Sequence, residues 1–129
     1  MKYTLIVHSP PNAGGGSRSA LAFARALLAA GHETTRVFFY HDGVENGLAG
    51  RVTPQGESDL LGAWEAFTRD TGSELALCIA AALRRGVLND EEAQRYDRAG
   101  PTISSAFTIV GLGQLVDAML QSDRCVTFV

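Results

Sequence analysis

Two cysteines and three histidines carry the most reactive chemistry in this sequence. Cys78 lies in the apolar run Leu75–Ile79 and precedes an alanine-rich segment of helical character, Ala80–Gly86. A cysteine between a buried strand and a helix can place its sulfur near free N–H groups and the positive end of the helix dipole, which favour the thiolate. Arg84 and Arg85 can add positive potential. The alternative is an inert thiol, because a free cysteine also packs as a small apolar side chain.

The histidines can move protons, but they do not form a metal-binding pattern. His8 and His41 each follow an expected strand, so their imidazoles either face a functional edge of a sheet or are merely structural. His32 lies where a helix is expected to end, and the helix dipole favours a partial positive charge there. The chain holds no Cys-x-x-Cys or His-x-x-x-His pair, so no metal site is expected.

A glycine-rich loop, Asn12–Ser17, joins the first expected strand to a helix, and such a turn can present backbone N–H groups to a phosphate. The loop lacks the Gly-Lys-Ser/Thr of a P-loop, and Ser19 stands where a dinucleotide fingerprint needs its third glycine. Gly111–Gly113 also lacks a third glycine. We therefore interpret both segments as strand-to-helix turns.

The elements that must position these residues alternate along the chain. Short β-branched and aromatic runs are separated by longer segments of helical period, which is typical of βαβ units around a parallel sheet. The expected strands are Tyr3–His8, Thr35–Tyr40, Leu75–Ile79, Phe107–Val110 and Cys125–Val129. A length of 129 residues suits one domain spanning the whole chain. The sequence thus predicts an α/β fold with a five-stranded, mainly parallel sheet flanked by helices.

Apolar residues at helical spacing predict three main helices between these strands. The first follows the glycine-rich loop, with Ser17 as its N-cap and Gly31 as its terminating residue. The second begins after Ser58 and ends at Gly72. The third carries an apolar stripe of Leu112, Leu115, Val116, Met119 and Leu120.

Two segments lie outside this pattern. Asn89 with Glu92 resembles a capping box that opens another short helix. His41–Gly56 contains repeated glycines, shows no clear period and is long for a connection between a strand and a helix. We expect His41–Gly56 to be either mobile or ordered by a partner.

Composition narrows the class of protein. The chain is 46% hydrophobic and 19% charged, which excludes a disordered tail and a coiled coil. Eleven Lys and Arg against fourteen Asp and Glu give a net charge of −3, which disfavours tight, direct binding of nucleic acid. No apolar run is long enough for a signal peptide or a membrane helix, so we expect a cytoplasmic protein in which Cys78 and Cys125 are free thiols.

Several longer runs resemble the TusD/DsrE family of sulfur-relay subunits, with TusD as the most similar branch. In order along nearly the whole chain, the runs are Gly31–Glu33, Val37–Val44, Cys78–Gly86, Phe107–Leu115 and Asp123–Arg124. The resemblance implies a three-layer, flavodoxin-like α/β fold over residues 1–129. It also implies a cysteine, matching Cys78 here, that carries sulfur as a persulfide and needs no cofactor.

The resemblance further implies a sulfurtransferase subunit with several protein partners. These are two smaller, TusB/TusC-like homologues in a heterohexamer, a TusA-like sulfur donor and a TusE/DsrC-like acceptor. The end product would be 2-thiouridine at the wobble position of tRNA, without direct contact between this chain and nucleic acid.

Three other functions stay open. They are a DsrE-like carrier in dissimilatory sulfur oxidation, a non-catalytic scaffold with an inert Cys78, and a small flavin- or nucleotide-binding module. Two features depart from the family pattern: the first loop, Pro10–Gly16, and Cys125, which we expect to pack in a core strand.

Overall fold

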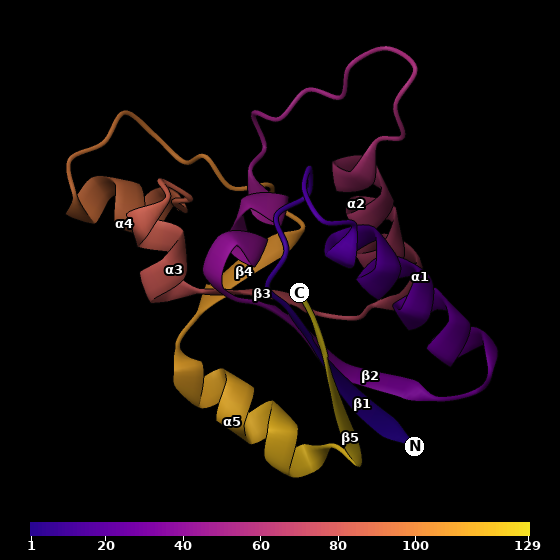
Figure 1. Cartoon of the computed structure of the whole chain (residues 1–129). Helices are drawn as coiled ribbons and strands as arrows, with labels where there is room; N and C mark the ends of the chain where they lie inside the picture. Colours follow the sequence, from indigo (N-terminus) through magenta and orange to yellow (C-terminus); the bar gives the residue numbers. More distant parts are fainter.

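The computed structural model describes residues 1–129, and its centre is a five-stranded sheet (Figure 1). The strands are β1 (Lys2–Val7), β2 (Glu33–Phe39), β3 (Leu75–Cys78), β4 (Phe107–Val110) and β5 (Arg124–Phe128). Their order across the sheet is β4-β3-β2-β1-β5, and every neighbouring pair is parallel. The predicted α/β class and strand number are confirmed. The strand order differs from the order 2-1-3-4-5 of flavodoxin itself.

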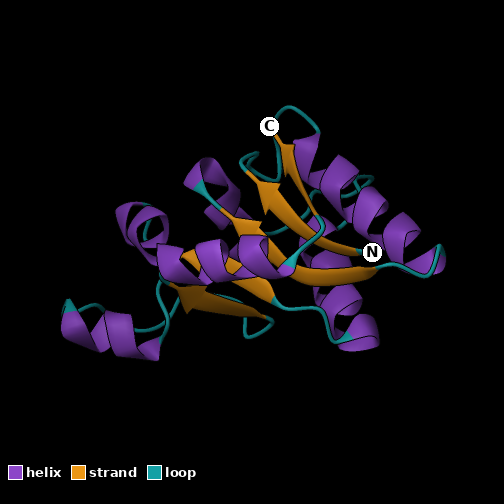
Figure 2. Ribbon diagram, turned by 90° about the horizontal axis from the view of Figure 1, so that it is seen from below, coloured by secondary structure: helices purple, strands orange, loops and turns teal.

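Helices cover both faces of this sheet. They are α1 (Gly16–Ala29), the 3-10 helix η1 (His41–Gly47), α2 (Leu60–Thr71), α3 (Ile79–Arg84), α4 (Asp90–Arg95) and α5 (Leu112–Gln121). Helices α1 and α2 lie on one side of the sheet, and α5 crosses the other side (Figures 1 and 2). Helix α3 packs against η1 beside the carboxyl end of β3. None of the helices has the length and apolar character needed to cross a bilayer.

Aromatic side chains from different elements join the sheet to the α1 and α2 layer. Phe39 on β2 meets Trp64 on α2 and Phe107 on β4 edge to face, with ring centroids 5.2 Å and 5.4 Å apart. All three rings are buried. The indole N–H of Trp64 donates to the hydroxyl of Ser17 on α1 at 3.1 Å, so its polar group is satisfied inside the core.

Three predicted helix boundaries are confirmed. Gly31 after α1 and Gly72 after α2 adopt the left-handed conformation, with φ of 86° and 72°, which glycine enters without a Cβ penalty. The side chain of Asn89 caps α4 by accepting from the amide of Glu92 at 2.9 Å.

The predicted start of α1 is wrong. Its N-cap is Gly15, and the buried Ser17 donates its hydroxyl to the side-chain oxygen of Asn46 in η1 at 2.6 Å. Asn46 in turn donates from its side chain to the carbonyls of Ser9 at 3.1 Å and Gly43 at 2.8 Å. Ser17 therefore fastens η1 to the body of the fold instead of capping its own helix.

The expectation that His41–Gly56 is mobile or ordered by a partner is wrong for its first half. Residues His41–Gly47 form η1, and Leu48 pairs with Ile103 in an isolated bridge. Gly43 packs so closely that a Cβ there would collide with the carbonyl oxygen of Val7. The chain itself orders this segment, through the buried side chain of Asn46 and the close approach at Gly43.

The apolar stripe predicted on α5 exists, but most of it faces solvent. Exposed fractions are 47% for Leu112, 55% for Val116, 43% for Met119 and 82% for Leu120. Ala118 is the one fully buried residue of the helix. Helix α5 thus covers the sheet with Ala118 and the half-buried Leu115, and turns the rest of its apolar stripe outward.

Candidate active site

Cys78 lies at the junction of β3 and α3. The run Leu75–Leu77 before it is fully buried, as expected for a strand covered on both faces, and the following alanines favour a helix. Cys78 is the N-cap residue of α3, with φ −61° and ψ 124°. Its side chain forms no capping hydrogen bond, so the thiol stands at a helix start whose first N–H groups lack intrahelical partners.

The thiol of Cys78 is closed off from solvent in the isolated chain. The residue is 1% exposed and belongs to the main hydrophobic core. A buried cysteine is inert until something gives reactants access to it. Any chemistry at Cys78 therefore requires the junction of β3 and α3 to open.

His8, Tyr40 and Cys78 form a row at the carboxyl edge of the sheet. Each stands one position beyond residues that pair in register across β1, β2 and β3. The amide of Tyr40 extends the β1–β2 pairing by donating to the carbonyl of Val7 at 3.0 Å. Because side chains alternate along a strand, this row belongs to the face that α5 crosses.

The structure brings the predicted residues His8 and His41 together, with Tyr40 beside them. The ring of His41 lies edge-on to both, with centroids 4.9 Å from His8 and 4.3 Å from Tyr40. His41 adopts φ 50°, a left-handed conformation that is uncommon outside glycine. Neither imidazole forms a hydrogen bond with the sulfur of Cys78, so the histidines are neighbours of the site without a direct link to the thiol.

The electrostatics of this cluster favour the neutral form of His8. Burial lowers the pKa of His8 below its ordinary value, and the nearby His41 lowers it further, because two protonated rings repel each other. A neutral imidazole keeps one ring nitrogen free to accept a proton. Tyr40 stands between His8 and Cys78 in the row at the sheet edge. Sequence reasoning missed it, although it ends the expected strand next to His41.

Arg85 is paired and does not supply free positive charge to the thiol. Its side chain donates to the carboxylate of Asp42 in η1 at 3.0 Å and to the carbonyl of Ala81 at 3.0 Å. The ion pair ties η1 to the C-terminal end of α3, the helix that begins directly after Cys78. Arg84 is exposed, forms no ion pair and lines a groove at the far end of α3.

Two other predicted candidates lie outside this site. The Nδ1 atom of His32 accepts a hydrogen bond from the amino group of Met1 at 3.0 Å, at the opposite edge of the sheet. Cys125 is exposed, so the expected packing role is wrong. The reason is that β5 is an edge strand: Phe128 packs against Phe23 of α1, while Cys125 points to the other face, which α5 leaves open there.

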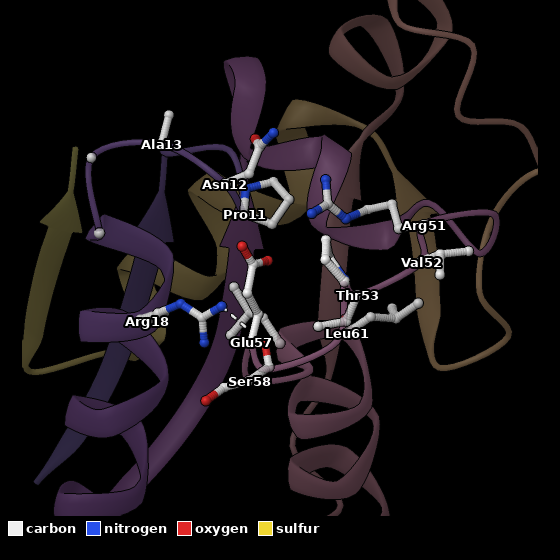
Figure 3. A pocket seen from close by; sticks show the side chains of 14 residues that line it. Pro11, Asn12, Ala13, Arg18, Arg51, Val52, Thr53, Glu57, Ser58 and Leu61 are labelled. Carbon is white, nitrogen blue, oxygen red and sulfur yellow. Dashed lines mark hydrogen bonds between the residues drawn. The ribbon is translucent and has the colours of Figure 1, made fainter.

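The glycine-rich loop lines a cavity of about 420 Å³ on the α1 side of the sheet (Figure 3). The loop is a strand-to-helix turn, as interpreted from the sequence, in which Gly14 and Gly15 both adopt φ 74°. Arg18, Arg51 and Glu57 point into the same space in Figure 3, and Arg18 donates to the carbonyl of Ser58 at 3.0 Å. This cavity mixes both signs of charge and does not include Cys78.

Residues 1–128, and with them the whole site, match the DsrE/DsrF-like family. The chain belongs to this family. It is 46% identical to a protein named sulfurtransferase TusD homolog from Pseudomonas aeruginosa, over 99% of this chain and 97% of that one. Sulfurtransferase TusD of an Enterobacter species is 43% identical, over 99% and 100% of the two chains. The putative sulfurtransferase DsrE of Allochromatium vinosum is 41% identical, over 99% and 98%. The predicted TusD/DsrE family is thereby confirmed.

A solved structure, the YchN protein of E. coli, has the same fold. It superposes with a TM-score of 0.77 over 99% of this chain and 100% of that one, at 23% sequence identity. At this identity the likeness concerns the fold alone.

Proposed function

We propose that this chain is a sulfurtransferase subunit that carries sulfur as a persulfide on Cys78. The observation that carries the proposal is the position of Cys78 at the N-cap of α3, on the carboxyl edge of a parallel sheet. Ligands and substrates of open α/β sheets gather at that edge. The relatives named sulfurtransferase match this chain over nearly its full length, which supports the same class of reaction.

The transfer consists of two balanced exchange steps. The Cys78 thiolate attacks the outer sulfur of a donor persulfide, R–S–SH, the donor S–S bond breaks, and R–S⁻ leaves while Cys78–S–SH forms. An acceptor thiolate then attacks the outer sulfur of Cys78–S–SH, and the Cys78 thiolate is released. No oxidant, reductant or cofactor enters either step.

The proposed partners are proteins, because a partner must both exchange sulfur with Cys78 and open the junction of β3 and α3 that buries its thiol. A TusA-like carrier would donate sulfur, and a TusE/DsrC-like protein would accept it. Two smaller, TusB/TusC-like homologues would complete a heterohexamer. The exposed apolar side chains Leu112, Val116 and Leu120 of α5 support assembly with other subunits, since a stripe of this kind loses its contact with water in an interface.

The pathway we favour ends in 2-thiolation of the wobble uridine of tRNA, with tRNA bound only by a downstream enzyme. The net charge of −3 fits a chain that does not hold nucleic acid itself. A DsrE-like role in dissimilatory sulfur oxidation is the second candidate, supported by the relative from Allochromatium vinosum.

Sulfur loading of single-cysteine variants tests the proposal. Wild type, Cys78→Ser and Cys125→Ser are incubated with the persulfide-charged donor, and intact mass with peptide mapping locates the added sulfur. We expect one added sulfur on Cys78 in wild type and Cys125→Ser, and none on Cys78→Ser. Loading that persists in Cys78→Ser, or that maps to Cys125, would make the scaffold function the better explanation.

A further inference from the structure

A groove of about 510 Å³ at the C-terminal ends of α3 and α4 is not used by the chemistry described above. Its lining residues are Leu83, Arg84, Gly86, Leu88, Tyr96 and Arg98. Leu88 is 7% exposed and belongs to the floor, whereas Tyr96 is 49% exposed. The groove thus combines an apolar floor with a half-exposed aromatic ring.

The backbone around the groove is held by two helix caps of the Schellman type. After α3, Gly86 adopts φ 72°, and the amides of Gly86 and Val87 donate to carbonyls of the last turn at 3.3 Å and 2.9 Å. After α4, Asp97 adopts φ 55°, and the amides of Asp97 and Arg98 donate in the same way at 3.2 Å and 2.8 Å. These carbonyls are therefore satisfied, and the side chains of the rim project from a fixed backbone.

Both charged residues of the groove are positive and unpaired. Arg84 and Arg98 form no ion pair, whereas Arg85 and Arg95 beside them do. Unpaired arginines next to an accessible tyrosine are the residue types that most often dominate protein interfaces. The charge of this groove is opposite to the net charge of the chain, which is −3. Carboxylates of a partner polypeptide are the complementary groups.

The groove lies close enough to Cys78 for one polypeptide to reach both. Leu83 and Arg84 end the six-residue helix that begins directly after Cys78. A helix of that length spans about 9 Å, and about three extended residues cover the same distance. A protein that brings its reactive sulfur to Cys78 can therefore lay its neighbouring residues into the groove.

We propose that this groove binds an acidic, extended segment of the polypeptide that exchanges sulfur with Cys78. Leucine-like side chains of the segment would pack on Leu88 and Tyr96, and its carboxylates would pair with Arg84 and Arg98. The inference rests on the proposed function, because that function supplies the reason for a protein to approach this edge.

Peptide binding tests the charge selection of the groove. The probe is a short fluorescein-labelled peptide in which glutamate alternates with leucine, and its control has glutamine in place of glutamate. By fluorescence anisotropy, the wild-type chain should bind the glutamate peptide at least about tenfold more tightly than the glutamine peptide, with an affinity that falls as salt rises. Equal binding of the two peptides, or binding of neither, would overturn the proposal.

Matched charge reversals test the location. The double variant Arg84→Glu/Arg98→Glu should weaken binding of the glutamate peptide at least about tenfold. The control Arg69→Glu/Arg124→Glu makes the same change in net charge on α2 and β5 and should bind nearly as wild type does. Equal affinity of wild type and the groove variant would place the peptide elsewhere. Self-association of wild type that the groove variant loses would show a second copy of this chain in the groove, and would equally overturn the proposal.

Loading with a small persulfide separates this inference from the function on which it rests. Glutathione persulfide needs no groove and reaches Cys78 whenever the junction of β3 and α3 opens locally. In a background without Cys125, the wild-type groove and the groove variant should therefore load Cys78 to the same extent. Failure of both proteins to load would contradict the proposed function, while the peptide titrations would still decide whether the groove selects an acidic segment.

Discussion

Replacing Cys78 by serine should preserve the fold while removing sulfur transfer, because Cys78 occupies the N-cap of α3. Serine is among the best N-cap residues, since its hydroxyl accepts a hydrogen bond from an N–H group of the first turn. The position is 1% exposed, so a hydroxyl without a partner would cost about 1–3 kcal/mol there. The capping bond therefore decides whether the serine variant is stable.

Cys78→Ala is the reference for this effect, because alanine offers neither a thiol nor a cap. Serine stabilises an N-cap over alanine by about 0.5–2 kcal/mol. We expect Cys78→Ser to unfold about 3–4 °C above Cys78→Ala, as a difference near 1 kcal/mol implies for a chain of this size. Thermal denaturation followed by circular dichroism measures the difference, and mass spectrometry should find sulfur on neither variant at position 78.

The opposite order of stability would refute the reasoning. A serine variant less stable than the alanine variant would mean that the side chain at position 78 points away from the free N–H groups of α3. The helix start would then be unable to stabilise a thiolate at position 78 as well, because that effect depends on the same geometry.

Two further predictions concern the access of reagents to the Cys78 thiol and the loss of stability at low pH. Asp42→Asn removes the ion pair with Arg85, whose side chains are 60% exposed for Asp42 and 26% for Arg85, and such a pair stabilises by about 0.2–1 kcal/mol. Local opening of the junction should become more frequent by the same free energy, so alkylation of Cys78 should accelerate about 1.4- to 5-fold. The measurement is made in a background without Cys125. Glu91→Gln, which removes an exposed pair within α4, is the control, and equal rates in all proteins would contradict the role of the η1–α3 contact. The lowered pKa of His8 means that the folded state resists protonation, so wild type should lose stability as the pH falls below about 6.5, the ordinary histidine pKa, toward the lowered value. His8→Asn should lose less over the same range in urea denaturation, and parallel losses would show that His8 does not cause the acid sensitivity.

Local sequence patterns were sufficient to locate the strands. The run Phe107–Val110 is predicted at its observed bounds, and the other strands shift by no more than two residues at either end. Buried strands of a parallel sheet are short, β-branched or aromatic, and bounded by turn residues, so each one is visible in its own segment. Cys78 is placed at a strand-to-helix junction for the same reason.

Features that depend on distant parts of the chain were not predictable in this way. The hydroxyl of Ser17 bonds to Asn46, 29 residues away, and local reasoning assigns it to the nearest helix start instead. The exposure of Cys125 follows from the strand order, which places β5 at an edge. Periodicity shows that α5 has an apolar stripe, but it does not show whether the sheet of the same chain or another subunit covers that stripe.

Solvent access and the proposed chemistry point to different cysteines in this molecule. Cys125 is exposed and Cys78 is buried, so in the isolated chain an indiscriminate reagent reaches Cys125 first. A persulfide gives up its outer sulfur to any thiolate that reaches it. A persulfide on a solvent-exposed cysteine would therefore lose its sulfur to small thiols in a cell. Burial would protect the proposed persulfide on Cys78, and delivery of its sulfur would then need a partner that opens the junction. Binding can shift that equilibrium only by contacts made better in the open state. Those contacts must form on surfaces that move with α3, because α3 begins directly after Cys78 and the Asp42–Arg85 pair ties its C-terminal end to η1.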